Sequence, residues 1–140
     1  MKALLQRVSR ASVSTGGQVV DSIGRGLLVL AGFRAQDTRA DLEWMASKIL
    51  NLRVFPDDAG EMNVCLGDVR GELLVVSQFT LHADTRKGRR PSFVRAAPPE
   101  QAETLFALFV EMLRSSGTRT GSGVFGAMMD VELVNDGPVT

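Results

Sequence analysis

The sequence predicts an α/β fold in which mixed, largely antiparallel sheets carry two helices packed against them. Segments of strand length, apolar or alternating, recur along the chain and are separated by Gly-rich or polar turns. The three- and four-residue spacing of an amphipathic helix occurs only twice. With 140 residues, the chain is long enough for a sizeable core and fits one domain, so we expect residues 1–140 to form a single domain.

Strands are expected in the first third of the chain. The opening segment partly alternates and is expected to place four residues near a core: Leu5, Val8, Ala11 and Val13. The TGGQ stretch at 15–18 is typical of a hairpin turn, and VVDSI at 19–23 is then the returning strand. The continuous apolar run GLLVLAGF at 26–33 predicts a strand covered on both faces.

Two segments have the helical period. The first helix follows Thr38, which forms a capping-box pattern with Asp41, and it presents an apolar face of Leu42, Met45, Ala46, Ile49 and Leu52. The second helix opens with prolines at 98–99 and ends before Gly117. Its predicted apolar face consists of Ala102, Leu105, Phe106, Phe109, Met112 and Leu113.

A long central strand is predicted from Glu72 to Leu81, and two last strands around 118–122 and 128–134. The central strand begins with a buried-type run, LLVV at 73–76, and then carries Ser77, Gln78 and Thr80. Polar groups at the end of a buried strand are typical of ligand sites in open α/β sheets, and backbone N–H groups there can form an oxyanion hole. An edge strand with an ordinary polar face is the alternative.

A basic loop follows this strand. The formal net charge is zero, so anion binding must come from local clustering. The loop provides it with five cations and no acid: Arg86, Lys87, Arg89, Arg90 and Arg95. Such a patch could bind several phosphates, although charged loops are often simply solvated.

Cysteine and histidine are too few for a zinc motif. Cys65 and His82 are the only residues of their types, so we expect no metal site and no cofactor. A lone cysteine fits a reducing compartment, and no stretch has the length of a signal sequence or membrane span, so a cytoplasmic location is expected. His82 stands about 7 Å along a strand from Thr80, which disfavours it as a general base, and we expect it to be solvated.

Several of these stretches together resemble the D-aminoacyl-tRNA deacylase family. The family's motifs occur in order as LLQRVSRASV, KILNLRVF, GELLVVSQFTL, ADTRKGRRPSF and VELVNDGPVT. SQFT at 77–80 and NDGPVT at 135–140 are the most specific of them. By itself NDGPVT indicates only a turn.

The resemblance implies hydrolysis of the ester that joins a D-amino acid to the 3′ end of tRNA, with mischarged glycyl-tRNA as a related substrate. It also implies a homodimer in which Gly137 and Pro138 form a cis peptide that enters the partner's active site. Their two carbonyl oxygens would exclude an L side chain, so rejection rather than affinity would set the chirality. Ser77, Gln78, Phe79 and Thr80 would frame the ester.

The resemblance leaves the mechanism open between Thr80 as a nucleophile and water activated with help from the 2′-hydroxyl of the terminal adenosine. We favour the second, because no base lies near Thr80 in the sequence. Arg86, Lys87, Arg89 and Arg90 are expected to bind tRNA phosphates. Two other functions are consistent with the same residues: a non-catalytic nucleic-acid-binding protein, and an esterase for small molecules that uses Ser77 or Thr80.

Overall fold

The computed structural model describes all residues, 1–140, as a mixed α/β fold. Its strands are β1 (Lys2–Thr15), β2 (Gln18–Ile23), β3 (Gly26–Gly32), β4 (Phe55–Pro56), β5 (Met62–Val64), β6 (Glu72–Ser77), β7 (Thr120–Ser122) and β8 (Asp130–Asn135). Its helices are α1 (Arg39–Asn51), the short 3₁₀ helix η1 (Phe79–His82) and α2 (Pro99–Ser115).

The main sheet has the strand order β2-β1-β3-β6-β7, and β8 also pairs with β1. All pairings of β1 are antiparallel, whereas β3–β6 and β6–β7 are parallel. The first half of β1 pairs with β3, and its second half pairs with β2 and β8. β1 therefore curves around and nearly closes the sheet. The predicted mixed, largely antiparallel sheet with two helices is confirmed.

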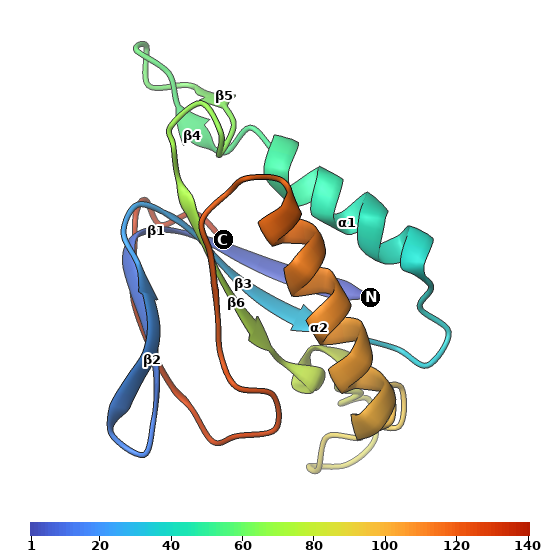
Figure 1. Cartoon of the computed structure of the whole chain (residues 1–140). Helices are drawn as coiled ribbons and strands as arrows, with labels where there is room; N and C mark the ends of the chain where they lie inside the picture. Colours follow the sequence, from blue (N-terminus) through green and yellow to red (C-terminus); the bar gives the residue numbers. More distant parts are fainter.

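The two helices lie side by side over one face of the sheet (Figure 1). Alternate side chains of the central strands define the two sides of the sheet. Leu27 and Val29 of β3 belong to the cluster that includes the helices, whereas Leu28 joins a second cluster with Val8 and Val13 of β1. The run predicted at 26–33 is thus buried on both faces, as its continuous apolar character indicated.

Most predicted elements occur where the sequence places them. β1 and β2 form the expected hairpin, and α1 begins with the complete Thr38–Asp41 capping box. All predicted face residues of α2 are buried except Met112, which packs partly buried against the core. Beyond the main sheet, β4 and β5 form a small separate hairpin. None of the helices has the length and apolar character needed to cross a membrane.

The prediction of one strand from Glu72 to Leu81 is wrong at its end. β6 stops at Ser77, and residues 79–82 form η1 instead. Its parallel neighbour β3 also ends at this level, since Ala31 is the partner of Ser77. Beyond Ser77, the backbone hydrogen bonds between β3 and β6 cannot continue as a strand pair, and the chain turns out of the sheet.

Candidate functional site

The backbone turns out of the sheet at Gln78. Gln78 has φ −145° and ψ 83°, and its N–H donates to the Ala31 carbonyl across 2.8 Å. This bond fixes the start of η1 to the end of β3. The SQFT residues, 77–80, therefore occupy a strand end followed by a tight turn, here called the SQFT turn. This turn exposes backbone groups that a continuous strand would bury.

A cavity of about 700 Å³ opens at this strand end. Its walls come from four parts of the chain: the end of β3, residues 76–79, residues 93–102 and residues 125–131. The lining is mostly apolar, with Ser77 and Gln78 as polar groups. Phe79 and Phe93 meet edge to face at its mouth, with ring centroids 5.1 Å apart. A mostly apolar cavity with a few converging polar groups is typical of a small-molecule or cofactor-sized site.

Thr80 lies beside the cavity without lining it. Its Oγ1 accepts a hydrogen bond from the Gln78 side-chain amide, and Thr80 is exposed. An amide N–H is a donor and cannot remove the proton of a hydroxyl. Nothing in this contact activates Thr80 as a nucleophile.

The backbone donors of the turn are not equivalent. The N–H of Gln78 is occupied by the Ala31 carbonyl, whereas the N–H of Phe79 has no protein acceptor. An unpaired backbone N–H at a cavity is available to a bound carbonyl or oxyanion. Of Gln78 and Phe79, only Phe79 therefore has a free main-chain N–H donor.

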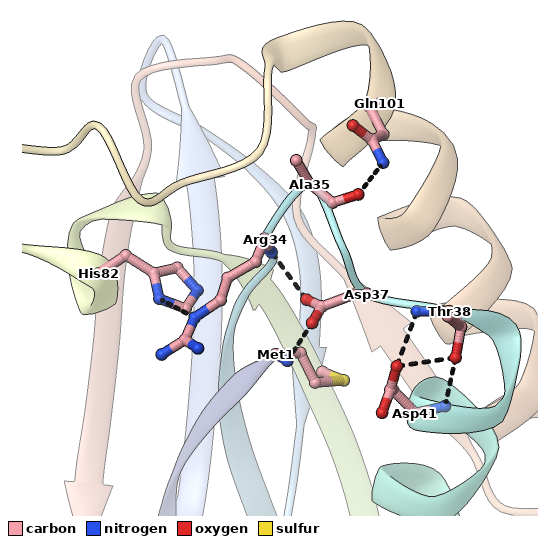
Figure 2. A network of polar contacts seen from close by, with 8 residues as sticks. All are labelled: Met1, Arg34, Ala35, Asp37, Thr38, Asp41, His82 and Gln101. Carbon is pink, nitrogen blue, oxygen red and sulfur yellow. Dashed lines mark hydrogen bonds and ion pairs between the residues drawn. The ribbon is translucent and has the colours of Figure 1, made fainter.

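The expectation that His82 is solvated is wrong. His82 is 1% exposed, because η1 turns its ring inward toward β3 rather than letting the chain continue as a strand. Nε of Arg34 is 3.5 Å from its Nδ1, and its Nε2 has no hydrogen-bond partner (Figure 2). Burial lowers the pKa of His82, and the positive charges of Arg34, Lys2 and the amino terminus lower it further, against an opposing contribution from the Gly32 backbone.

The basic loop closes on itself through Asp84. Asp84 and Ser92 form an isolated antiparallel bridge, and the Asp84 carboxylate accepts hydrogen bonds from Arg86 and lies 3.5 Å from Arg95. These contacts, the Arg86 hydrogen bonds foremost, lower the pKa of Asp84 to about 2, so it stays ionised at neutral pH. Three cations of the loop form no ion pair: Lys87, Arg89 and Arg90.

The C-terminal turn, residues 135–140, is held in place at both ends. Asn135 Oδ1 accepts from the Val139 N–H at 2.7 Å, and its Nδ2 donates to the Val139 carbonyl at 3.1 Å. On β1, Arg7 donates from Nε to the Asp136 carbonyl at 2.9 Å. The peptide bond between Gly137 and Pro138 within this turn is cis, and both residues are exposed.

Within one chain, the two motifs do not share a cavity. Gly137 and Pro138 line no wall of the cavity at Ser77. A second, shallow groove of about 800 Å³, mostly apolar, lies between Val139–Thr140 and Leu81 of η1, with Leu4 and Leu5 among its lining residues. It therefore includes the end of the C-terminal turn and Leu81, the residue that directly follows SQFT, although no SQFT residue lines it.

The sequence matches a known family over almost its whole length. The family model of D-Tyr-tRNA(Tyr) deacylase matches residues 4–140. The chain belongs to this family. A D-aminoacyl-tRNA deacylase of Thermomicrobium roseum is 60% identical over 140 residues, which cover 100% of this chain and 91% of that protein. One of Dehalococcoides mccartyi is 59% identical, covering 100% and 92%.

Two solved structures are similar to almost the whole chain. A structure named c-Myc DNA Unwinding Element Binding Protein has a TM-score of 0.94 and 48% identity, over 99% of this chain and 95% of that one. A probable eukaryotic D-amino acid tRNA deacylase has a TM-score of 0.87 with 18% identity, over 97% and 94%. The second comparison supports the fold alone.

Sequence reasoning missed two parts of the site. Phe125 and Met129 line the cavity, although the segment between α2 and β8 has no period that would predict it. Arg7 was also missed, because its role depends on a C-terminal turn far away in the sequence. The side chain of Arg7 is 11% exposed, but the partial alternation of the first strand does not distinguish it from the other cations there.

Proposed function

We propose that this protein hydrolyses the ester bond between a D-amino acid and the 3′ end of tRNA, releasing the free D-amino acid and the tRNA. The observation that carries the proposal is the match to the deacylase family over residues 4–140, joined to a cavity that opens at the SQFT turn. Mischarged glycyl-tRNA is a second substrate on this proposal, because glycine has no side chain to exclude. Residues 1–140 act as one deacylase domain.

The SQFT residues frame the ester. The free N–H of Phe79 is placed to donate to the substrate carbonyl as negative charge develops on it. Ser77 and the Gln78 side chain are the polar groups in the cavity wall that can orient the amino acid. Removal of one oxyanion donor costs about 2.7–4 kcal/mol in well-studied hydrolases, so a single donor of this kind is a substantial contribution.

Water, rather than Thr80, is the proposed nucleophile. Thr80 has no base in contact, and the only histidine, His82 at the end of η1, has a buried side chain. The 2′-hydroxyl of the terminal adenosine lies next to the ester in the substrate itself and can assist the attacking water. The protein then contributes position and charge stabilisation.

The chirality filter requires a second copy of the chain. Gly137 and Pro138 are exposed, clamped by Asn135 and Arg7, and outside the cavity of their own chain. A second copy docked on the apolar groove beside Leu81 would bring its turn close to the SQFT turn. Two fixed carbonyl oxygens there would clash with an L side chain, whereas a D-amino acid places hydrogen at that point.

The unpaired cations of the basic loop are proposed to bind tRNA phosphates. Lys87, Arg89 and Arg90 are exposed and form no ion pair, whereas Arg86 is already engaged by Asp84 and would contribute less. The loop leads directly into Phe93 at the cavity mouth. This connection to the cavity supports a role for the cations in binding the acceptor end of the tRNA.

The function is tested by deacylation of matched D- and L-aminoacyl-tRNAs with the purified protein in the presence of a chelator. We expect hydrolysis of the D substrate at least about 100-fold faster, which corresponds to about 3 kcal/mol of steric discrimination. Glycyl-tRNA should be hydrolysed as well. Equal rates for both enantiomers would contradict the filter, and no hydrolysis of either would contradict the function.

Thr80→Ala separates the two mechanisms. If water is the nucleophile, the variant loses the Gln78 contact but retains its chemistry, and we expect a rate within about tenfold of the native protein. The rate constant is measured in single turnover with enzyme in excess. Loss of all turnover in a folded variant that still binds tRNA would instead assign the nucleophile to Thr80.

DNA binding without catalysis is a second candidate, favoured by the 48% identity to the protein named c-Myc DNA Unwinding Element Binding Protein and by the basic loop. The same preparation distinguishes the two. Salt-dependent binding of DNA in a protein that leaves D-aminoacyl-tRNA intact would favour this candidate.

A further inference from the structure

His82 is a buried titratable group that the proposed ester hydrolysis does not use. It ends η1, two residues after Thr80, and its side chain is 1% exposed. The ring lies against the backbone of Gly32: a Cβ placed on Gly32 would come within 3.2 Å of both Cδ2 and Nε2 of His82. The same Cβ would be 2.8 Å from the Gln78 carbonyl oxygen. The ring therefore packs where η1 meets the end of β3.

The partner of His82 is itself held rigidly. Arg34 faces Nδ1 through its Nε, and its backbone N–H donates to Asp37 Oδ2 at 2.7 Å. Gln101 of α2 donates to the neighbouring Ala35 carbonyl at 2.7 Å (Figure 2). The segment that carries Arg34 is thus fixed before any substrate binds.

The surroundings favour the neutral ring. Arg34 donates toward Nδ1, so the imidazole proton belongs on Nε2. Lys2 of β1 is hydrogen-bonded through Nζ to the Leu81 carbonyl, next to His82 in sequence, and adds positive charge. The carboxylate of this region, Asp37, is already bound by the Met1 amino group at 2.6 Å. No carboxylate remains to balance an imidazolium.

We propose that neutral His82 is a positioning residue that holds the η1 turn, and with it the free N–H of Phe79, against the end of β3. A proton on Nδ1 would place an N–H against the Arg34 donor and a second positive charge beside it. The ring would then leave its site on Gly32, and η1 would lose a support. This inference rests on the proposed ester hydrolysis.

The consequence is a fall in the reaction rate at acidic pH, the acid limb, that is caused by protonation of His82. Because the folded protein holds the pKa of His82 below its ordinary value, the turn is intact above the unfolded-state pKa, which is about 6.5. Its stabilisation is lost as the pH falls from there through the folded-state pKa. The rate constant should fall as the pH passes down through the folded-state pKa, whereas the substrate concentration that gives half the maximal rate should change little.

The test compares native protein with His82→Phe and His82→Asn in single-turnover deacylation of D-aminoacyl-tRNA between about pH 5 and about pH 8. Phe keeps the ring shape and Asn keeps an acceptor for Arg34, but neither titrates in this range. We expect both variants to lack the acid limb and to be about tenfold slower than native protein at the upper end of the range. Far-UV circular dichroism at each pH establishes that the proteins are folded.

A second measurement needs no variant. His82 is the only histidine in the chain, so its ring proton resonance in the native protein is unambiguous. Its NMR midpoint should lie below the ordinary value and coincide with the midpoint of the acid limb. An ordinary midpoint, or an acid limb that persists unchanged in both variants, would overturn the inference. D-specific hydrolysis at the upper end of the range would still stand in that case, so failure of this inference is distinct from failure of the proposed function.

Discussion

Gly137→Ala should abolish most of the preference for D- over L-aminoacyl-tRNA, expected above to be at least about 100-fold, because the C-terminal turn has no room for a side chain. Gly137 has φ +151°, and a Cβ there would lie 2.6 Å from the Val139 nitrogen and 2.7 Å from its Cγ2. The nitrogen belongs to the backbone and is held by Asn135, so the turn itself must shift. A displaced turn can no longer present its carbonyl oxygens at the proposed position in the partner's site.

The measurement is single-turnover deacylation of D- and L-aminoacyl-tRNA, together with urea unfolding. Local strain should cost about 1–3 kcal/mol of unfolding free energy. Gly60→Ala is the matched control, since Gly60 also has positive φ but a Cβ placed there would have no atom within 4 Å. We expect the control to lose stability and keep its D selectivity. Native D selectivity in Gly137→Ala would mean that the turn takes no part in the chirality filter.

The accuracy of the sequence predictions depends on the range of the interactions involved. The capping box at Thr38 and the apolar face of α2 depend on neighbours three or four residues apart, and both occur as predicted. The end of β6 depends on where β3 ends, which is a property of another strand. Propensity and pattern within 72–81 therefore could not indicate the turn at Gln78.

The site predictions also succeed or fail according to the range of the interactions involved. Ser77 and Gln78 line the cavity at the strand end where the sequence placed a ligand site, although their roles there remain a prediction. The burial of His82 was not predictable, because it follows from η1 packing against Gly32 and Arg34, about 50 residues earlier in the chain. The grouping of five cations suggested one patch, but the pairing of Asp84 with Arg86 and Arg95 divides it. Only the folded arrangement separates engaged cations from available ones.

Gly32→Ala is expected to lower the rate of D-aminoacyl-tRNA deacylation, because it displaces the SQFT turn from β3. The new methyl would stand 2.8 Å from the Gln78 carbonyl oxygen, a backbone atom, and 3.2 Å from the His82 ring. The SQFT turn must therefore shift. Because the hydrogen bond from the Gln78 N–H to the Ala31 carbonyl holds its start, we expect the turn to tilt away from Gly32. A shift of about 1 Å in a positioned group can reduce a rate about 100-fold, and the overpacking should cost about 1–3 kcal/mol of stability.

The Gly32→Ala experiment has a control within the chain and a way to locate the clash. Gly67→Ala adds the same methyl where no atom lies within 4 Å, so it should leave the rate unchanged. Adding His82→Ala to Gly32→Ala removes the ring but leaves the contact with Gln78. If the carbonyl is the main obstacle, as its shorter distance indicates, the double variant stays about as slow as Gly32→Ala. Recovery in the double variant to the rate of His82→Ala alone would show that the ring is the main clash, and a native rate in Gly32→Ala would show that the turn tolerates displacement from β3.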